Sequence, residues 1–187
     1  MKTITFLFLL VSQIGFGQTL SLPEPKSRLE ISLNAGYAPD NAFDREPWRG
    51  GFIRSSLSLL KTSGNIQYGL SIEGGTNSND HWYFTPGIIV NHKFPGRQTY
   101  FYSGAMAGYV CSGDMLGNPG RKNSLSQGYV LGLQGGWVKP IGKRMSFNAE
   151  LALRSTQVWI PPFDDQMKPA KDFILYLPVT VGLRYLL

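Results

Sequence analysis

The stretch that decides the fold is residues 51–75, GFIRSSLSLLKTSGNIQYGLSIEGG. Before Ser63-Gly64 the apolar Ile53, Leu57 and Leu59 occupy odd-numbered positions, and after it apolar residues occupy the even-numbered positions from Ile66 to Ile72. Because successive side chains of a strand point to opposite faces, this pattern predicts two strands, each with one apolar and one polar face. A two-residue turn at Ser63-Gly64 joins them and sets Arg54 opposite Glu73, with apolar residues opposite apolar ones.

The same alternation recurs along the rest of the chain and predicts eight strands without a helix. It is clear in 29–38, 127–138, 145–155 and 173–187, and weaker in 82–94 and 98–111, where Pro86 and Tyr100-Phe101-Tyr102 interrupt it; the facing of 98–111 stays open. Of the seven connections the first, fifth and seventh are long (39–50, 112–126, 156–172) and the second, fourth and sixth are short (62–65, 95–97, 139–144), with 75–80 as the third. This is typical of an all-β fold, an eight-stranded antiparallel up-and-down transmembrane β-barrel with a polar, side-chain-filled lumen.

Composition limits the possible classes of protein. The 187 residues allow one domain, and charged residues make up only 16%, against about a quarter in ordinary soluble domains. The single cysteine, Cys111, excludes an intrachain disulfide framework and a Cys-rich metal site. The net charge of +6 comes without a Lys/Arg stripe, so we expect no nucleic-acid partner.

The N-terminus has the layout of an export signal. Lys2 precedes an apolar run that begins at Ile4, and Gly15 and Gly17 supply the small residues of a cleavage site before Gln18. We therefore predict a signal peptide over 1–17, a periplasmic N-terminal segment over 18–28 and the barrel over 29–187.

Periodicity alone does not say which face points inward. A secreted lipocalin-like barrel has its apolar face inside, whereas a membrane barrel has that face in lipid. The polar face here is mostly Gly, Ser, Asn, Thr and Gln, and its charges balance, as an enclosed lumen requires. These lumen charges are Glu30, Arg54, Glu73, Glu150, Arg154 and Arg184. Tyr and Trp near the strand ends suit an aromatic girdle, so the membrane interpretation is favoured.

The last six residues, Gly182-Leu183-Arg184-Tyr185-Leu186-Leu187, resemble the terminal-strand pattern of outer-membrane β-barrels, Gly-x-x-aromatic-x-aromatic. Gly182 and Tyr185 match, and Leu187 stands where Phe is usual. With the export signal and the eight strands, the whole mature chain resembles the small OmpA/OmpX-type barrels, often called porin-family proteins. The resemblance implies the outer membrane of a Gram-negative bacterium, outer-membrane lipids as neighbours and reading of this terminal signal by the barrel assembly machinery.

That resemblance implies a fold and a cellular location but not a specific function, since such barrels include adhesion proteins, membrane stabilisers, secretion accessories and a few enzymes. We predict a non-enzymatic membrane scaffold or surface-loop binding protein. The alternative is a lipid-A-modifying enzyme for acyl transfer or deacylation, but neither His81 nor His92 lies in the His-x-Ser-Asn element of the deacylase barrels. A narrow pore and a secreted lipocalin-like binder stay open as less favoured interpretations.

The connections supply the remaining candidates. Apolar residues in nominally exposed loops often mark contacts, and the loop contact candidates are Trp48, Trp159, Ile160 and Phe163. The last loop either folds over the barrel mouth, lies at the lipid surface or meets an extracellular or envelope protein partner. At the other end, basic residues form a rim that could attract acidic phospholipids or a periplasmic partner: Lys61, Arg97, Lys139, Lys143 and Arg144. The acidic pairs Asp40/Asp44 and Asp164/Asp165 do not match a calcium loop, so no metal or cofactor is expected.

Overall fold

A computed structural model of the chain describes residues 28–39, 51–76, 81–96, 98–114, 125–160 and 170–187. These residues form nine strand segments. They are β1 (Arg28–Ala38), β2 (Phe52–Ser63), β3 (Ile66–Thr76), β4 (His81–Pro95), β5 (Tyr100–Asp114), β6 (Ser126–Pro140), β7 (Met145–Ile160), β8 (Ala170–Tyr176) and β9 (Val179–Leu186). Among them no helix has the length and apolarity needed to span a bilayer.

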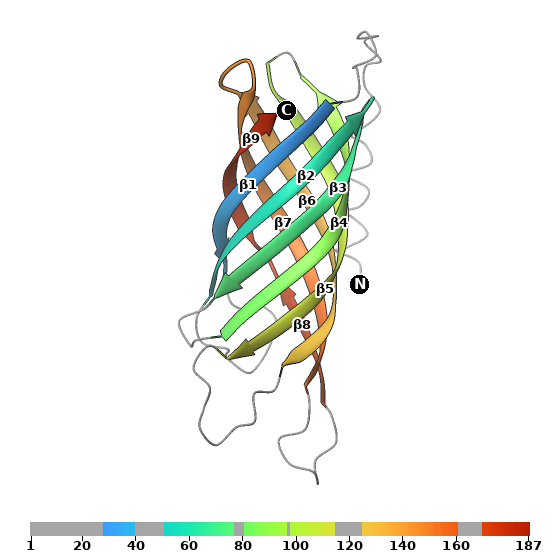
Figure 1. The fold of residues 1–187 in the computed structure, drawn as a ribbon, viewed down its shortest axis with the longest axis vertical. Helices are drawn as coiled ribbons and strands as arrows, with labels where there is room; N and C mark the ends of the chain where they lie inside the picture. Colours follow the sequence, from blue (N-terminus) through green and yellow to red (C-terminus); the bar gives the residue numbers. More distant parts are fainter. Residues whose placement is uncertain (1–27, 40–50, 77–80, 97, 115–124, 161–169) are drawn as a thin grey trace, which may run out of the picture.

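The strands form one closed antiparallel barrel (Figure 1). Each strand from β1 to β7 pairs with the next, β7 pairs with both β8 and β9, and β9 returns to β1. Because β8 and β9 are two successive segments of one strand that runs along β7, the barrel wall has eight strands, as the sequence predicts. The short turns and the C-terminus lie at one end, here named the turn end, and the opposite end is named the loop end.

Two prolines interrupt the ladders, Pro178 in a segment with clear alternation and Pro86 where the sequence blurs it. Leu177 and Pro178 separate β8 from β9, and the Pro178 carbonyl accepts a hydrogen bond from the Ala152 amide at 3.0 Å. In β4, the pairing with β5 skips Thr85 and Pro86 but resumes in the same register. A proline cannot donate to a ladder, so it weakens the pairing locally without shifting the strand.

The predicted turn of the β2–β3 hairpin was wrong by one position. Ser63 pairs with Ile66, so the two-residue turn is Gly64-Asn65, with Gly64 at φ 58°. Arg54 consequently pairs with Gly75 rather than with Glu73. The new register differs from the predicted one by two residues, which leaves every side chain on its predicted face.

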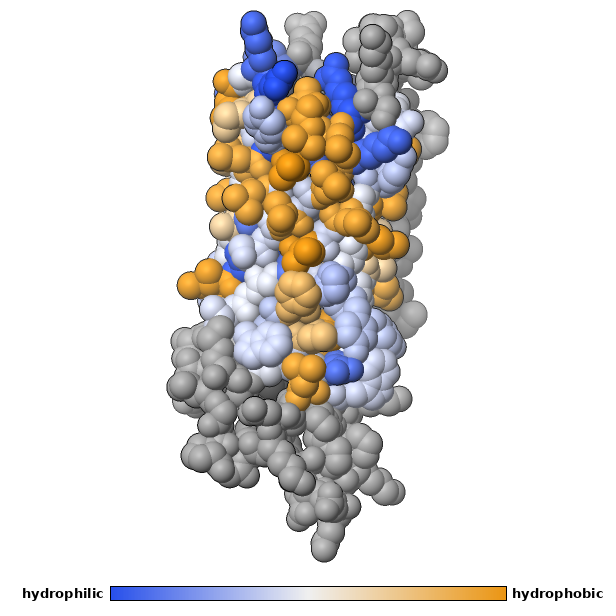
Figure 2. Space-filling view, viewed as in Figure 1, coloured by the Kyte–Doolittle hydropathy of each residue, from blue (hydrophilic) through white to orange (hydrophobic). Residues whose placement is uncertain are grey.

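The apolar faces point outward, which confirms the membrane interpretation and excludes the lipocalin-like one. Leu33, Leu70, Leu151 and Val181 are 51–63% exposed. Large apolar residues are exposed on every strand of the wall, and Figure 2 shows them gathered over the turn-end half and the middle of the face in view. In water such a surface would be an aggregation liability, whereas in a bilayer it is the required exterior.

The facing of β5, open in the sequence, is settled by burial. Tyr102, Met106 and Val110 are buried in the lumen, and Phe101 and Tyr109 are exposed on the exterior. With Leu60, Ile89 and Val130, Met106 forms an apolar cluster inside the barrel. The lumen is therefore not uniformly polar.

Candidate functional site

All six charged residues predicted for the lumen lie on the inward faces of their strands. Arg54, Glu73, Arg154 and Arg184 are buried, and Glu30 and Glu150 are intermediate in exposure. Their side chains form two clusters at different heights in the barrel, joined by amide side chains.

The cluster nearer the loop end centres on Glu73. Its carboxylate pairs with the Arg54 guanidinium and lies 3.8 Å from Arg154 Nε. Arg154 Nη2 lies 3.9 Å from Glu150, the carboxylate on its own strand. Tyr83 donates to Glu73 at 3.3 Å and Tyr102 donates to Glu150 at 2.7 Å. Two carboxylates thus hold two guanidinium groups and two phenols.

The cluster nearer the turn end centres on Glu30. Lys93 Nζ lies 3.2 Å from one carboxylate oxygen, and Arg184 Nη1 lies 3.9 Å from the other. Gln67 also donates to Glu30 at 3.1 Å. Lys93 lies 4.6 Å from the ring centroid of Tyr100, and the Arg184 guanidinium lies 4.6 Å from that of Tyr102. The aromatic faces therefore add cation–π stabilisation to the ion pairs.

Amide side chains connect the two clusters. Arg154 donates to Gln134 at 2.9 Å, Gln134 to Asn91 at 2.9 Å and Asn91 to Gln67 at 3.3 Å; Arg184 also donates to Gln67, at 3.0 Å.

A second set of amides crosses β9. Asn148 donates to Asn34 at 2.7 Å, and the two flank Gly182 of β9. A Cβ at position 182 would clash with Asn34 Oδ1 and the Leu33 carbonyl. Glycine is required here because the amide pair uses the space of its side chain.

Contacts between opposite sides of the wall show how full the lumen is. Arg154 of β7 reaches Glu73 of β3, and Lys93 of β4 reaches Glu30 of β1. In both pairs at least two other strands separate the partners along the wall. An eight-stranded barrel is just wide enough for side chains to fill it, and the buried network fills it at both heights. The network connects strands that are far apart along the wall.

Sequence reasoning missed Lys93 and the four lumen tyrosines, Tyr83, Tyr100, Tyr102 and Tyr176. Counting Lys93, the described lumen holds four cations and three carboxylates, an excess of one positive charge. Strict alternation from the inward Ile89 and Asn91 would have placed Lys93 inside in the forward direction and Tyr83 inside in the backward direction, past Pro86.

Of the two histidines, the structure describes the side chain of His92. His92 is exposed on the exterior, beside Ser103 of β5, and its ring lies 4.7 Å from Phe94. Glu30, Glu73 and Glu150 are all in the lumen, so none of them reaches this histidine. His81 begins β4 at the loop end. The part of the chain that the structure describes contains no group of three His, Cys, Asp or Glu residues fit to hold a metal ion.

The predicted loop contacts are partly corrected. β7 extends to Ile160, so Trp159 lies on a strand; its ring packs edge-to-face on Tyr129 at 5.4 Å. It belongs to an aromatic girdle on the loop side of the exterior, and Ile160 ends the strand. Trp48 and Phe163 lie outside the described residues, as do 1–17 and nearly all of 18–28.

Aromatic residues mark both borders of the apolar band. On β5, Phe101 and Tyr109 are eight residues apart, and so are Tyr129 and Trp137 on β6. Eight residues span about 26 Å along a strand, or about 20 Å across the membrane at a tilt of roughly 40°, close to the ~25 Å apolar band of such barrels. Tyr185 and Leu187 of the terminal pattern are exposed on the exterior.

Comparison with solved structures agrees with this geometry. Neisserial surface protein A (NspA) matches over 88% of this chain and 99% of its own, with a TM-score of 0.62 at 12% identity. The chain has the fold of the small outer-membrane β-barrels. A major outer membrane protein from Thermus thermophilus (TM-score 0.55, 13% identity, 87% and 100% covered) and OprG from Pseudomonas aeruginosa (0.51, 11%, 86% and 94%) are also similar to this barrel. The predicted outer-membrane location accords with these neighbours. No family model and no curated protein matches the chain.

Proposed function

We propose that this barrel is a non-enzymatic protein of a Gram-negative outer membrane that serves as a rigid support for its long loops. The observation that carries the proposal is the network across the lumen. Because Arg154 meets Glu73 and Lys93 meets Glu30 across the lumen, these side chains of the interior are already held in ion pairs. Binding then falls to the surface, above all to the long connections, which the strand bounds place at 39–51, 115–125 and 161–169.

The loop end differs from the turn end in ways that suit contact with a partner. Its connections are the longest of the chain, and they carry both charged residues and the apolar Trp48 and Phe163. Loops on a rigid scaffold commonly carry binding functions. The partner proposed here is an extracellular or envelope protein.

The test compares cells that display the whole chain with cells in which residues 41–49, 116–123 and 162–168 are replaced by Gly-Ser linkers of equal length. Both proteins are first shown to fold by heat-modifiable gel mobility. We expect attachment to surfaces or to other cells to fall with the linkers. Equal attachment by both strains would contradict the loop-binding role.

The alternatives need separate measurements on the intact protein. Planar bilayers should show no stable conductance steps after repeated insertion, and a regular conductance would favour a narrow pore. The lipid A of cells with and without the protein should have the same acylation in mass spectra. A changed acyl pattern would favour the enzyme and overturn the proposal.

A further inference from the structure

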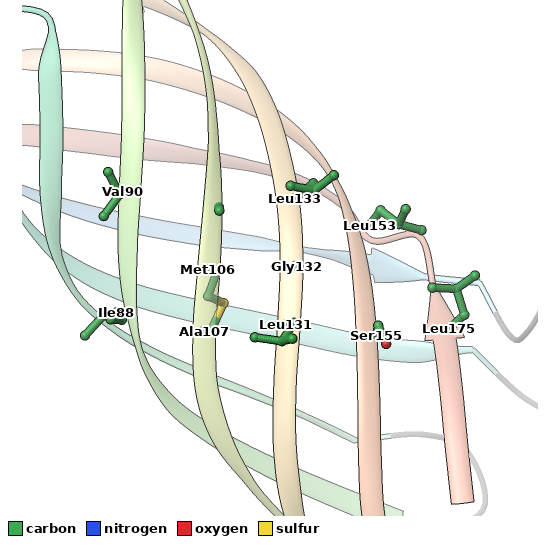
Figure 3. A pocket seen from close by; sticks show the side chains of 11 residues that line it. Ile88, Val90, Met106, Ala107, Leu131, Gly132, Leu133, Leu153, Ser155 and Leu175 are labelled. Atoms are coloured by element: carbon green, nitrogen blue, oxygen red, sulfur yellow. The ribbon is translucent and has the colours of Figure 1, made fainter. Parts of the chain in front are cut away.

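A shallow hollow interrupts the lipid-facing surface over β4–β8 (Figure 3). Its volume is about 520 Å³, and its lining is almost entirely apolar. Two rows of directly opposed side chains form it. One row is Ile88, Ala107, Leu131, Ser155 and Leu175, and the other is Val90, Ala105, Leu133 and Leu153.

The hollow results from short side chains set between long ones. In each row an alanine of β5 lies between branched residues of β4 and β6, and Ser155 lies between two leucines. In the next row toward the turn end, Ser103 of β5 and Gly135 of β6 are again short. Short side chains therefore continue for one row beyond the hollow, and Phe101 and Trp137 of the girdle lie opposite each other in the following row, before the β6–β7 turn.

That turn carries a concentration of positive charge. Lys139, Lys143 and Arg144 are exposed, and so are Arg28 and Lys61 elsewhere on the same end. The described acidic residues lie either in the lumen or at the loop-end parts of β5 and β8, so the exterior of the turn end, as far as the structure describes it, has no Asp or Glu. The positive charge on the exterior of the turn end is therefore not neutralised by acidic side chains of the described residues and can attract an anionic ligand.

The depth of the hollow below this rim matches one leaflet of a membrane. Lys139 is six residues from Leu133 on β6, which is about 20 Å along the strand and about 15 Å across the membrane at a tilt near 40°. The hydrocarbon core is about 30 Å thick, so about 15 Å is the depth of one leaflet. A lipid with its head group at the rim therefore places the end of an acyl chain at the hollow.

We propose that this face binds an anionic phospholipid of the turn-side leaflet. One acyl chain fills the hollow beside Ala105 and Ala107, and the head-group phosphate is held by Lys139, Lys143 and Arg144. This site is independent of the proposed loop function, because it uses the opposite end and the outside of the barrel.

The test uses native mass spectrometry of the full chain purified with equal amounts of phosphatidylglycerol and phosphatidylcholine of identical acyl chains. We expect the wild type to retain phosphatidylglycerol preferentially. K139Q/K143Q should lower that preference about tenfold or more, since each basic residue near a membrane surface strengthens binding to anionic lipid about fivefold. R28Q/K61Q removes the same charge from the other side of the turn end and should leave the preference unchanged.

The hollow is tested with a second pair of variants. Ala105→Leu fills it and should reduce the retention of both lipids severalfold, whereas Ala35→Leu adds the same volume to the exposed face of β1 and should have no effect. Each variant is first checked for heat-modifiable mobility, and Ala105→Val replaces the leucine variant if that one fails to fold. Equal retention of the two lipids by the wild type, equal losses in the two charge variants, or unchanged retention in the filled hollow would each overturn the proposal.

Discussion

The strongest test of the lumen network is the substitution Glu73→Gln. The exposed fractions of the Glu73, Arg54 and Arg154 side chains are only 1–2%. The substitution keeps the shape of the side chain but removes the anion that both guanidinium groups share. Arg54 is then left uncompensated, because its Nε and Nη1 already have no hydrogen-bond partner within the described residues. The excess positive charge of the described lumen rises from one to two.

The expected cost follows from burial. Removing one partner of a buried ion pair costs about 3–5 kcal/mol, whereas an exposed pair contributes about 1 kcal/mol or less. We therefore expect Glu73→Gln to lower the free energy of unfolding by about 3–5 kcal/mol. Adding Arg54→Met removes the stranded cation as well, so the double variant should regain a good part of the lost free energy.

The free energy of unfolding is measured by denaturant titration in lipid vesicles, with tryptophan fluorescence as the signal and heat-modifiable gel mobility as a check. Lys61→Gln, at an exposed rim position outside the proposed lipid site, is the control and should change stability by less than about 0.5 kcal/mol. A cost below about 1 kcal/mol for Glu73→Gln would show that water screens the cluster. The hypothesis that the ion-pair network excludes water and stabilises the barrel would then be refuted.

Three further substitutions test other parts of the wall. Leu70→Arg, on the exterior at the middle of β3, should lower the free energy of unfolding in vesicles by about 2–4 kcal/mol. Ile53→Arg, near the loop end of β2, should lower it by only about 0–1 kcal/mol, and equal losses would contradict the placement of the apolar band. Gly182→Ala should destabilise the barrel by about 1–3 kcal/mol, because the added Cβ overlaps the Asn34 side chain. Gly142→Ala is the control and should leave stability unchanged in the same titration, because the space around position 142 is open. Tyr185→Ala should slow the appearance of folded barrel in a pulse-chase experiment if the terminal pattern is read during assembly, and Tyr68→Ala, another exposed tyrosine, should not.

The sequence predicts the facing of a strand best where the two faces differ strongly in polarity. In β2 and β3 leucine and isoleucine alternate with serine and glycine, so burial agrees with the pattern. In β5 the lumen side carries Met106 and Val110 while the exterior carries Ser103 and two alanines. The contrast between the faces is then lost, and only the contacts of the folded barrel decide the facing.

The register of the first hairpin could not be derived from polarity for a different reason. A shift of two residues leaves each side chain on its own face, so the pattern fits turns at 63–64 and 64–65 equally well. The structure uses Gly64-Asn65 and joins Arg54 to Glu73 along a diagonal instead of directly across. The sequence predicted the ion pair but not the backbone pairing that produces it.

The network also lay beyond sequence reasoning in its detail. Opposite-wall contacts such as Arg154 with Glu73 depend on the barrel's closure and stagger, which strand-by-strand patterns do not contain. Lys93 was missed because His92 and Phe94, its neighbours on the outer face, and Pro86 further along the strand hide the alternation of β4.

The link between Glu30 and Arg184 also constrains the order of biogenesis. Glu30 belongs to the first strand to be synthesised and Arg184 to the last, so the contact between them forms only after the C-terminal segment has been made. Without β9 the barrel cannot close, and Glu30 keeps only its ion pair with Lys93 of β4. Insertion and closure are therefore expected to occur as a single concerted event, with the final strand as its trigger.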